Sequence, residues 1–494
     1  MKHAELFTSQ VVRKLDHYLM EHEDITAFAL MQRAAQAAFS TVLKLWPNAQ
    51  RLLVVAGTGN NGGDAWLVAK LAKDSGFAVQ LYYLGDPKSP EAQQAKRAAL
   101  AAGVAAQPFT GVLAEADLIV DGLFGIGATG EVQGQAAALI SVMNAHGAPI
   151  FALDVPSGLN ADTGAVLGVA VKAHTTLAFV AYKQGAFTLD GPDHCGQLLL
   201  ADLQAKPYYG HFPASALAIS SGLLNERGYG LPPRKVNSHK GLFGHVLMVG
   251  GDLGMGGALS LAVESCLRSG AGLVSCATRA DHVPVILART PEAMVRAVRS
   301  ALEASDWIEK ASVLAIGPGL GQGSWAQLLL QAVLSSNKPV VLDADALNLL
   351  AQPAWQHSFS EREVVLTPHP VEAARLLGVS TQEVQQDRFA AARALAQKYQ
   401  AVVVLKGCGS LIARPQQDAV ALCRAGNAGM STGGMGDVLT GIVAGLMAQG
   451  LNAWQAACLA VCVHGEAGDT GAQKNGSRGM LASDLAPYVQ ELLN

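Results

Sequence analysis

Two hydrophobic patterns alternate along the chain. Short, uninterrupted apolar runs such as residues 52–56 are followed by a glycine-rich or acidic segment, and then by a longer stretch, such as residues 66–72, with apolar positions at helical spacing. Runs of the first kind are typical of strands buried on both faces, as in parallel sheets. The pattern therefore predicts an α/β fold. The predicted strands cover residues 52–56, 79–84, 118–120, 149–153, 313–316, 340–342, 364–366 and 402–405, and a further run opens at His245.

The composition changes near the middle of the chain. The length of 494 residues exceeds the roughly 250 to 300 residues at which a single core stops growing. Half of the residues are hydrophobic and only 15% are charged, so each half can bury a core of its own. Pro, Tyr, Gly and Ser become frequent over residues 202–240, which indicates a connection near residue 215. We predict two α/β domains, residues 1–215 and 216–494.

Charge and cysteine content narrow the class of protein. The net charge of −4 provides no basic surface for nucleic acid. The seven cysteines are odd in number and form no CxxC pair, which is typical of reduced thiols rather than of disulfides or a zinc site. The N-terminal segment has no apolar signal region, and no run of about 18 apolar residues follows it. We expect a soluble cytoplasmic protein with no nucleic-acid or membrane partner.

The segment NAGMSTGGMGDVLTGIVAGL, residues 427–446, combines a glycine-rich loop with the start of an apolar helix. Glycines let backbone amides approach a ligand, and a helix N-terminus adds unpaired N–H groups, so such a place binds phosphate. Asp437 at this position is electrostatically unfavourable unless it has a chemical role, such as taking a proton from a hydroxyl that attacks the phosphate. A simple capping role for Asp437 is the alternative.

Three further glycine-rich loops each follow a predicted strand of the first half. They cover residues 57–65, 121–131 and 154–164. The carboxyl ends of parallel strands meet at one edge of a sheet, where ligands bind, so the three loops are expected to converge. The first loop matches GxGxxG, although an ordinary tight turn does so nearly as often. Asn60 and Asp64 would equip the crest of that loop to hydrogen-bond a polar ligand.

The second half lacks a GxxxxGK[ST] sequence, so a P-loop NTPase is not expected. Lys406 ends a predicted strand and is followed by Gly407 and Gly409. It could hold a nucleotide phosphate, or could be a lysine whose ammonium merely reaches solvent. His369 lies between two prolines, and a histidine in that setting is more often structural than catalytic.

The motifs GTGNNGGDA, VDGLFGIGATG and LDVPSGLNADTG resemble the epimerase half of the bifunctional NAD(P)H-hydrate repair enzymes. The resemblance implies a Rossmann-like three-layer sandwich, interconversion of the R and S hydrates of NADH and NADPH, and a bound potassium ion. By motif match, Asn61, Asp121 and Ser157 would hold K⁺, and their oxygen donors suit a hard cation. Asp154 is the candidate acid or base at the carbinol carbon. The residues implied to contact the hydrate are Asn60, Asn61, Gly62, Gly63, Asp64, Gly125, Ile126, Gly127, Ala128, Thr129, Gly130, Glu131 and Asp154.

Six motifs in the second half, GGDLGMGGA, IGPGLG, LDADALN, LTPHPVE, KGCGS and NAGMSTGGMGDVLTG, resemble in the same order the ADP-dependent dehydratase half of that family, which has a ribokinase-like fold. The resemblance implies that Asp437 deprotonates the ring hydroxyl of the hydrate, which is phosphorylated and then lost as phosphate, with Mg²⁺ on the nucleotide. The use of ADP rather than ATP rests on the resemblance alone. The implied hydrate contacts are Ala258, Gly319, His369 and Asp437, and the implied nucleotide contacts are Lys406, Gly407, Cys408, Gly409, Ser410 and Gly436.

The resemblance therefore implies a metabolite-repair enzyme with two activities, which acts on the hydrates NADHX and NADPHX, converts ADP to AMP and forms a homo-oligomer. Two other interpretations stay open at this point. The second half could be a small-molecule kinase fused to a nucleotide-binding module, and the first half could be a sensor without catalytic activity. A phosphorylated product left in solution would favour the kinase, and binding to the first half without epimerisation would favour the sensor.

Overall fold

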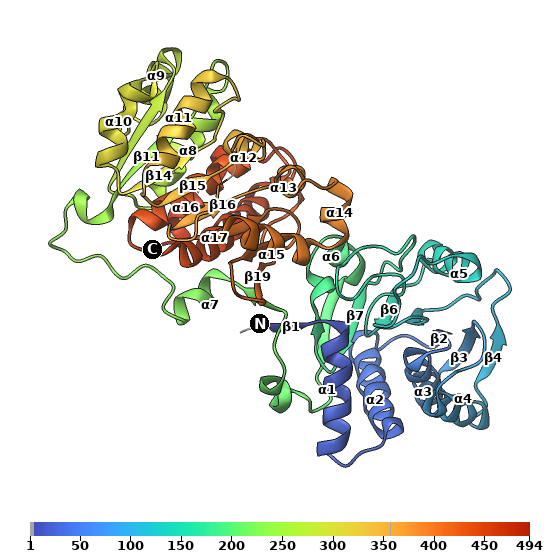
Figure 1. The fold of residues 1–494 in the computed structure, drawn as a ribbon. Coiled ribbons are helices and arrows are strands. Elements are labelled where there is room, and N and C mark those ends of the chain that lie inside the picture. Colours follow the sequence, from blue (N-terminus) through green and yellow to red (C-terminus); the bar gives the residue numbers. More distant parts are fainter. Residues whose placement is uncertain (1–3, 356) are drawn as a thin grey trace. The chain divides into compact units, whose positions relative to one another are not determined.

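The computed structural model describes residues 4–355 and 357–494, and the chain separates into two compact units, Ala4–Ala216 and Leu217–Asn494. Each unit is built on a sheet of mainly parallel strands with helices on both faces (Figure 1). The two-domain α/β organisation predicted from the alternating pattern is confirmed. Among the described residues, no helix is both long enough and apolar enough to cross a membrane.

The first unit contains a seven-stranded parallel sheet. Its elements are β1 (Ala4–Phe7), α1 (Ser9–His22), α2 (Ala27–Leu45), β2 (Arg51–Ala56), α3 (Asn60–Asp74), β3 (Ala78–Tyr83), α4 (Pro90–Ala101), β4 (Ala105–Pro108), β5 (Leu118–Gly122), α5 (Gly134–Ala145), β6 (Ile150–Leu153), β7 (Thr175–Phe179), β8 (Tyr182–Lys183), α6 (Gly191–Cys195) and β9 (Gln197–Ala201).

The strand order β4-β3-β2-β5-β6-β7-β9 reverses direction between β2 and β5, which is the arrangement of the Rossmann fold. Alternate residues of the strands enter two separate cores because successive side chains point to opposite faces. Val54 packs with apolar residues of α1 to α4, whereas its neighbour Val55 packs with α5. The sheet is thus the middle of three layers, and the switch point between β2 and β5 is where a ligand is expected.

The second unit is also a mainly parallel sheet covered by helices, and its sheet has more strands. Its elements are α7 (Ser221–Glu226), β11 (His245–Val249), α8 (Gly256–Arg268), β12 (Leu273–Thr278), α9 (Val283–Arg289), β13 (Met294–Ala297), α10 (Ala301–Lys310), β14 (Val313–Ile316), α11 (Ser324–Ser335), β15 (Val340–Leu342), α12 (Ala344–Leu350), β16 (Val364–Leu366), α13 (Pro370–Leu377), α14 (Thr381–Gln386), α15 (Arg388–Tyr399), β17 (Val402–Leu405), β18 (Ser410–Ala413), β19 (Val420–Cys423), α16 (Met435–Ala448), α17 (Ala453–Asn475) and α18 (Leu485–Leu492). One further strand, β10 (Ala216–Ile219), lies at the boundary of the two units in the sequence.

The strands run in the order β13-β12-β11-β14-β15-β16-β17-β18-β19. Neighbouring strands from β13 to β17 are parallel to each other, whereas β18 is antiparallel to both β17 and β19. Helices α8, α16 and α17 bury their apolar residues in one core under this sheet. The order again reverses at the first strand, so the loops after β11 and β14 flank a switch point.

Two helices begin earlier than the sequence indicates. Helix α3 starts at Asn60, so Asn60 and Asp64 lie in its first turns and not at the crest of a loop. Helix α16 starts at Met435, so Asp437 lies inside its first turn. The residue before α16, Gly434, has φ +93°, a conformation that glycine adopts readily and that ends the loop abruptly. Local glycine geometry therefore moves both sets of polar groups onto helix N-termini.

Candidate active sites

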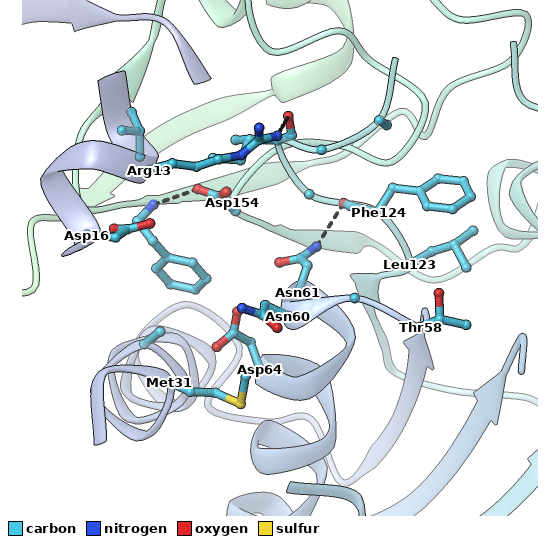
Figure 2. A pocket seen from close by; sticks show the side chains of 18 of the residues that line it. Arg13, Asp16, Met31, Thr58, Asn60, Asn61, Asp64, Leu123, Phe124 and Asp154 are labelled. Carbon is cyan, nitrogen blue, oxygen red and sulfur yellow. Dashed lines mark hydrogen bonds between the residues drawn. The ribbon is translucent and has the colours of Figure 1, made fainter. Parts of the chain in front are cut away.

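A cavity of about 1030 Å³ lies in the first unit at the carboxyl ends of β2, β5 and β6 (Figure 2). Its walls come from α1, α2, the start of α3 and the loop that follows β5. The sheet topology thus brings together the three loops that the sequence predicted to converge. The expected hydrate contacts that line this cavity are Asn60, Asn61, Asp64, Gly125, Ile126, Gly127, Ala128, Thr129, Gly130, Glu131 and Asp154, whereas Gly62 and Gly63 lie behind them in the first turns of α3.

Close packing around the turn between β2 and α3 leaves no room for a Cβ atom at positions 57, 62 and 63. A Cβ on Gly57 would lie 1.8 Å from the carbonyl oxygen of Leu123, and one on Gly62 would lie 2.1 Å from the carbonyl oxygen of Gly57. A Cβ on Gly63 would lie 2.5 Å from the end of the Met31 side chain. These glycines let the turn between β2 and α3 pack closely against its neighbours, and so place the N-terminus of α3 at the cavity.

Asp154 follows β6 directly and has φ +67°, which is uncommon for a residue other than glycine. Its carboxylate accepts a hydrogen bond from the Phe179 backbone N–H at 3.0 Å and a second one from the Lys183 ammonium. The Lys183 side chain is 1% exposed and also donates to the Phe179 carbonyl at 2.8 Å. The strained conformation is thus held by a buried ion pair, which fixes one Asp154 oxygen toward β7 and β8.

Two more carboxyl groups face the same cavity, Asp16 from α1 and Asp64 from α3 (Figure 2). Burial raises the pKa of Asp16 to about 7, and the Lys183 ammonium opposes that rise. Burial also raises the pKa of Asp64 well above its usual range, and the charges of Asp154 and Asp16 add to the effect. A cluster of three carboxyls with one ammonium can exchange protons with a bound ligand near neutral pH.

Sequence reasoning missed Asp16 and Lys183. A signal for Asp16 was present, because Val12, Leu15 and Leu19 form the buried stripe of α1 and Asp16 lies one turn after Val12, within that stripe. A carboxylate at such a position is unexpected for a purely structural helix. Lys183 gave no comparable signal, because it lies in a two-residue strand whose pairing is set by the tertiary fold.

The three predicted potassium ligands lie together beneath the cavity. The Ser157 hydroxyl donates to Asp121 Oδ1 at 2.6 Å and accepts from the Phe124 N–H at 2.8 Å. The Asn61 amide donates to the Phe124 carbonyl at 2.8 Å and the Leu153 carbonyl at 3.2 Å, while its own Oδ1 is buried without a partner among the described residues.

This donor set fits an alkali cation. It consists of carbonyl, amide, hydroxyl and carboxylate oxygens, which suit hard cations. Turning the Asn61 amide would direct the unpartnered Oδ1 toward the two carbonyl oxygens, an arrangement that a cation would stabilise. Asp121 is fully buried and has a pKa raised to about 6 by burial, although the Ser157 hydrogen bonds oppose that rise.

The second site is centred on Asp343, at the carboxyl end of β15. Its Oδ1 accepts hydrogen bonds from Lys406 Nζ at 2.9 Å and from Thr367 Oγ1 at 2.8 Å, and its Oδ2 accepts from Thr440 Oγ1 at 2.8 Å. Burial alone would lower the pKa of Lys406, but the charges of Asp343 and Glu372 outweigh it and the pKa is raised. Lys406 is therefore a fixed ammonium at the edge of the sheet, as a phosphate-binding lysine must be.

Helix α16 brings its N-terminus to this ammonium. A Cβ on Gly436 would lie 3.1 Å from Lys406 Nζ, so the helix backbone is directly beside the charge. Burial raises the pKa of Asp437 to about 7, the charge of Asp343 adds to the rise, and Lys406 opposes it. An ammonium, free helix amides and a carboxyl that titrates near neutrality thus meet at one point. The predicted residues Gly436, Lys406 and Asp437 are brought together.

His369 is the N-cap of α13. Its Nδ1 accepts from the backbone N–H groups of Val371 at 3.1 Å and Glu372 at 3.4 Å, and its Nε2 faces Glu372 Oε1 at 3.3 Å. Burial and the nearby Lys406 charge lower the pKa of His369. The imidazole is therefore neutral at pH 7, with its proton on the nitrogen that faces the Glu372 carboxylate. His369 thus caps α13 and lies beside the site, and its contact with the hydrate stays a prediction.

The segment KGCGS, predicted to contact the nucleotide, runs from Lys406 into β18, and Arg388 supports it from behind. This buried guanidinium donates to the carbonyl oxygens of Leu405, Lys406 and Gly409, each at 3.3 Å. A Cβ on Gly407 would lie 2.3 Å from Arg388 Nη1, so only glycine fits there. Arg388 thus holds the loop through its carbonyl groups. The side of the loop that faces away from Arg388 stays accessible to a ligand. The sequence offered no sign of Arg388.

A second unpredicted group, HGEAGD at residues 464–469 on α17, supports the loop before α16. The Asp469 carboxylate accepts from the Gly426 N–H at 3.0 Å and from the Asn427 amide at 2.9 Å. Asn427 Oδ1 in turn accepts from the Gly429 N–H at 2.9 Å. His464 of the same helix is buried near Met435, and burial lowers its pKa to about 4.

The remaining predicted contacts flank the switch point of the second sheet. Ala258 lies in the first turn of α8, which follows β11. Gly319 follows β14 with φ +57°, and its carbonyl accepts from the Asp252 N–H at 2.6 Å. A Cβ on Gly319 would lie 2.5 Å from the Met255 carbonyl oxygen, so the two loops are in contact here. Both residues are therefore placed where a ligand of this sheet is expected to bind.

Fold and sites define a two-domain α/β enzyme, with a cavity lined by carboxyl groups on a Rossmann-like unit and a helix N-terminus beside a lysine on the other unit. Comparison with protein families also divides the chain into two parts. Residues 246–491 match the family described as NAD(P)H-hydrate dehydratase, and residues 27–185 match the family described as YjeF-related protein N-terminus.

Relatives of known identity match over nearly the whole length. The chain is 44% identical to the bifunctional NAD(P)H-hydrate repair enzyme Nnr of Coxiella burnetii, over 99% of each chain. It is 42% identical to that of Escherichia coli, over 95% of this chain and 90% of the relative. The chain belongs to the family of bifunctional NAD(P)H-hydrate repair enzymes. The family and the enzyme class inferred from the sequence are therefore confirmed.

Solved structures match the second unit. A ribokinase-like superfamily protein of Enterococcus faecalis is 31% identical, with a TM-score of 0.52, over 56% of this chain and 94% of the other. The ADP/ATP-dependent NAD(P)H-hydrate dehydratase of Bacillus subtilis, co-crystallised with ATP and Mg²⁺, is 33% identical, with a TM-score of 0.50, over 55% and 96%. The ribokinase-like fold predicted for the second domain is confirmed.

Proposed function

We propose that this chain repairs hydrated NADH and NADPH through two activities. The first unit interconverts the R and S hydrates, and the second returns the S hydrate to NAD(P)H with conversion of ADP to AMP and phosphate. The observation that carries the second activity is the meeting of Asp437, the N-terminus of α16 and Lys406 at one point. Membership of the family over the full length supports the pairing of both activities in one chain.

In the second unit a kinase-like site serves a dehydration because hydroxide is a poor leaving group. Asp437 accepts the proton of the ring hydroxyl, which attacks the terminal phosphoryl group of the nucleotide. The Lys406 ammonium and the backbone amides at the start of α16 stabilise the negative charge on the phosphoryl oxygens. Loss of phosphate, assisted by the ring nitrogen, leaves an iminium cation, and loss of a proton from the adjacent ring carbon restores the carbon–carbon double bond of the dihydropyridine. Mg²⁺ would accompany the nucleotide phosphates and neutralise part of their charge.

In the first unit the hydrate occupies the cavity of about 1030 Å³, and Asp154 exchanges a proton beside the carbinol carbon. Potassium would be held beneath it by Asn61, Asp121 and Ser157. The support for that assignment is the buried, unpartnered Oδ1 of Asn61 beside several other oxygen donors. The ion would supply a positive charge that steadies the loop around Phe124, one wall of the cavity.

One assay tests both activities. The protein is mixed with an equimolar mixture of the R and S hydrates of NADPH, Mg²⁺, K⁺ and either ADP or ATP, and the absorbance of reduced nicotinamide is followed. Complete recovery is expected, faster than spontaneous epimerisation allows. Recovery that stalls near half would contradict the epimerase. A phosphorylated compound that accumulates without any recovery would identify a small-molecule kinase instead.

A further inference from the structure

Burial disfavours the charged form of two carboxyl groups in the cavity of the first unit, Asp16 and Asp64. Asp16 reaches the cavity from α1, and its Oδ1 is buried without a hydrogen-bond partner among the described residues (Figure 2). The hydrogen bond found for its neighbour Arg13 goes to the Ile126 carbonyl, at 3.3 Å. A buried carboxyl without a donor is costly as an anion, so the protonated acid is the favoured form there.

Asp154, on another wall of the same cavity, has the opposite environment. It accepts hydrogen bonds from the Lys183 ammonium and from the Phe179 N–H. Figure 2 shows Asp16 and Asp154 facing the same space. One carboxyl without a donor and one held by an ammonium form a pair that can supply both an acid and a base.

We infer that Asp16 is the second acid–base residue of the epimerase site, acting as the proton donor while Asp154 acts as the proton acceptor. This inference rests on the proposed epimerisation and adds a catalytic residue that lies outside every glycine-rich motif of the first unit. It also assigns a role to the only acidic residue within the apolar stripe of α1.

The Asp16 acid gives its proton to the ring hydroxyl, the carbon–oxygen bond breaks, and water leaves. The lone pair of the ring nitrogen forms the new bond, which makes a cationic iminium. A water molecule then adds to the other face of that carbon and gives a proton to the Asp154 carboxylate. In the reverse direction the two residues exchange roles, so no oxidant or cofactor is consumed.

Asp16→Asn in the full-length protein tests this role. Purified R hydrate of NADPH is incubated without nucleotide, and the two epimers are separated by chromatography, so that dehydration plays no part. We expect kcat for epimerisation to fall at least about 100-fold, with KM within about three-fold, because Asn keeps the shape and loses the proton. Lys14→Gln, an exposed change on the same helix, serves as the control.

The pH profile separates an acid from a merely structural residue. The charged groups that act on Asp16 are Lys183, Asp154 and Arg13, and the Asp64 carboxyl of α3 faces the same cavity and interacts with Asp16. In the wild type, kcat should fall as the pH rises through about 7, where Asp16 loses its proton. Asp16→Glu should restore part of the rate together with that fall. Wild-type kcat and pH dependence in Asp16→Asn would overturn the inference, as would a loss of activity in Asp16→Asn that Asp16→Glu does not reverse.

Two further outcomes distinguish a failure of the proposed epimerase activity from a failure of the role assigned to Asp16. Wild-type protein that does not interconvert the epimers above the spontaneous rate would contradict the proposed epimerase itself. Epimerisation by the wild type, with unchanged epimerisation by Asp16→Asn, would contradict only the role of Asp16. Thermal unfolding and the circular dichroism spectrum of each variant, compared with the wild type, show whether the first unit is folded.

Discussion

Lys406 Nζ lies 2.9 Å from Asp343 Oδ1, although the two residues are separated by 63 positions in the chain. The Asp343 side chain is 2% exposed, and its carboxylate also accepts hydrogen bonds from Thr367 and Thr440. Both oxygens of Asp343 are therefore engaged by the protein, and its role is to position the ammonium. Lys406 keeps further donor capacity, because an ammonium has three N–H groups.

Removal of one partner of this ion pair should destabilise the second unit. Lys406→Met leaves the Asp343 charge buried and unpaired, so the free energy of unfolding should fall by about 3–5 kcal/mol, and nucleotide binding should be lost. The double change Lys406→Met with Asp343→Asn should recover much of the stability and none of the nucleotide binding. Urea unfolding and ADP titration by calorimetry measure the two effects. Equal stabilities of the single and double variants would contradict the proposed pairing.

Asp437→Asn should separate the two activities. The amide keeps the shape of the side chain but cannot accept the hydroxyl proton, so the dehydration rate should fall by about 10²- to 10⁴-fold. Epimerisation should be unchanged, since Asp437 lies in the other unit. The measurement is the rate of NADPH recovery from pure S hydrate beside the rate of epimer exchange. Loss of both activities in a folded variant would contradict the assignment of separate sites.

The pH dependence of dehydration should report Asp437. Its pKa is raised to about 7, and the base must be ionised to act. The rate should therefore rise as the pH increases through about 7 and level off above it, whereas the epimerisation governed by Asp16 should fall over the same range. The two activities of one protein preparation should thus respond to pH in opposite directions. Parallel pH profiles would count against the assigned roles of both residues.

Asp437→Asn should also make the protein more stable in alkaline solution. A folded-state pKa raised above the unfolded value means that the native state binds the proton more tightly, so stability is lost as the pH rises from about 4 to about 7. Asn carries no charge and avoids that loss. We expect a gain on the order of 1 kcal/mol at pH 8 that shrinks toward pH 4. Thermal unfolding at the two pH values tests this, and an equal gain at both would exclude the electrostatic cause.

Asp469→Ala should loosen the loop that precedes α16 without a change in the acid–base groups. The carboxylate that holds the Gly426 N–H and the Asn427 amide would be absent, so the phosphate-binding amides would be less well ordered before ADP binds. The KM for ADP should rise several-fold, with a smaller effect on kcat. Asp418→Ala, in an exposed turn, is the matched control. An unchanged KM for ADP would show that this contact does not order the loop.

Replacement of K⁺ by tetramethylammonium should reduce epimerisation and leave the second unit unaffected. Asn61→Ala should have the same effect and should abolish the response to added K⁺, since it removes the unpartnered oxygen. The readout is epimer exchange as a function of K⁺ concentration, together with the melting temperature in each salt. A K⁺ response that is unchanged in Asn61→Ala would place the ion elsewhere.

Local sequence determined most of the fold, because buried parallel strands and glycine turns leave strong short-range signals. Residues 313–316, 340–342, 364–366 and 402–405 were predicted as strands and form β14, β15, β16 and β17 with those bounds. The convergence of the glycine-rich loops also followed from the sequence, since parallel strands must end at a common edge. Helix starts were less accurate, because they depend on the backbone conformation of single glycines such as Gly434.

Only the tertiary structure decided which side chains support these loops. Lys183, Arg388 and Asp469 each lie in an element that carries no recognisable motif, and each acts on backbone or carboxylate groups brought to it by the fold. The protonation preferences of Asp16 and Asp437 have the same origin. Burial and neighbouring charges set them, and both are properties of an assembled site rather than of a stretch of sequence.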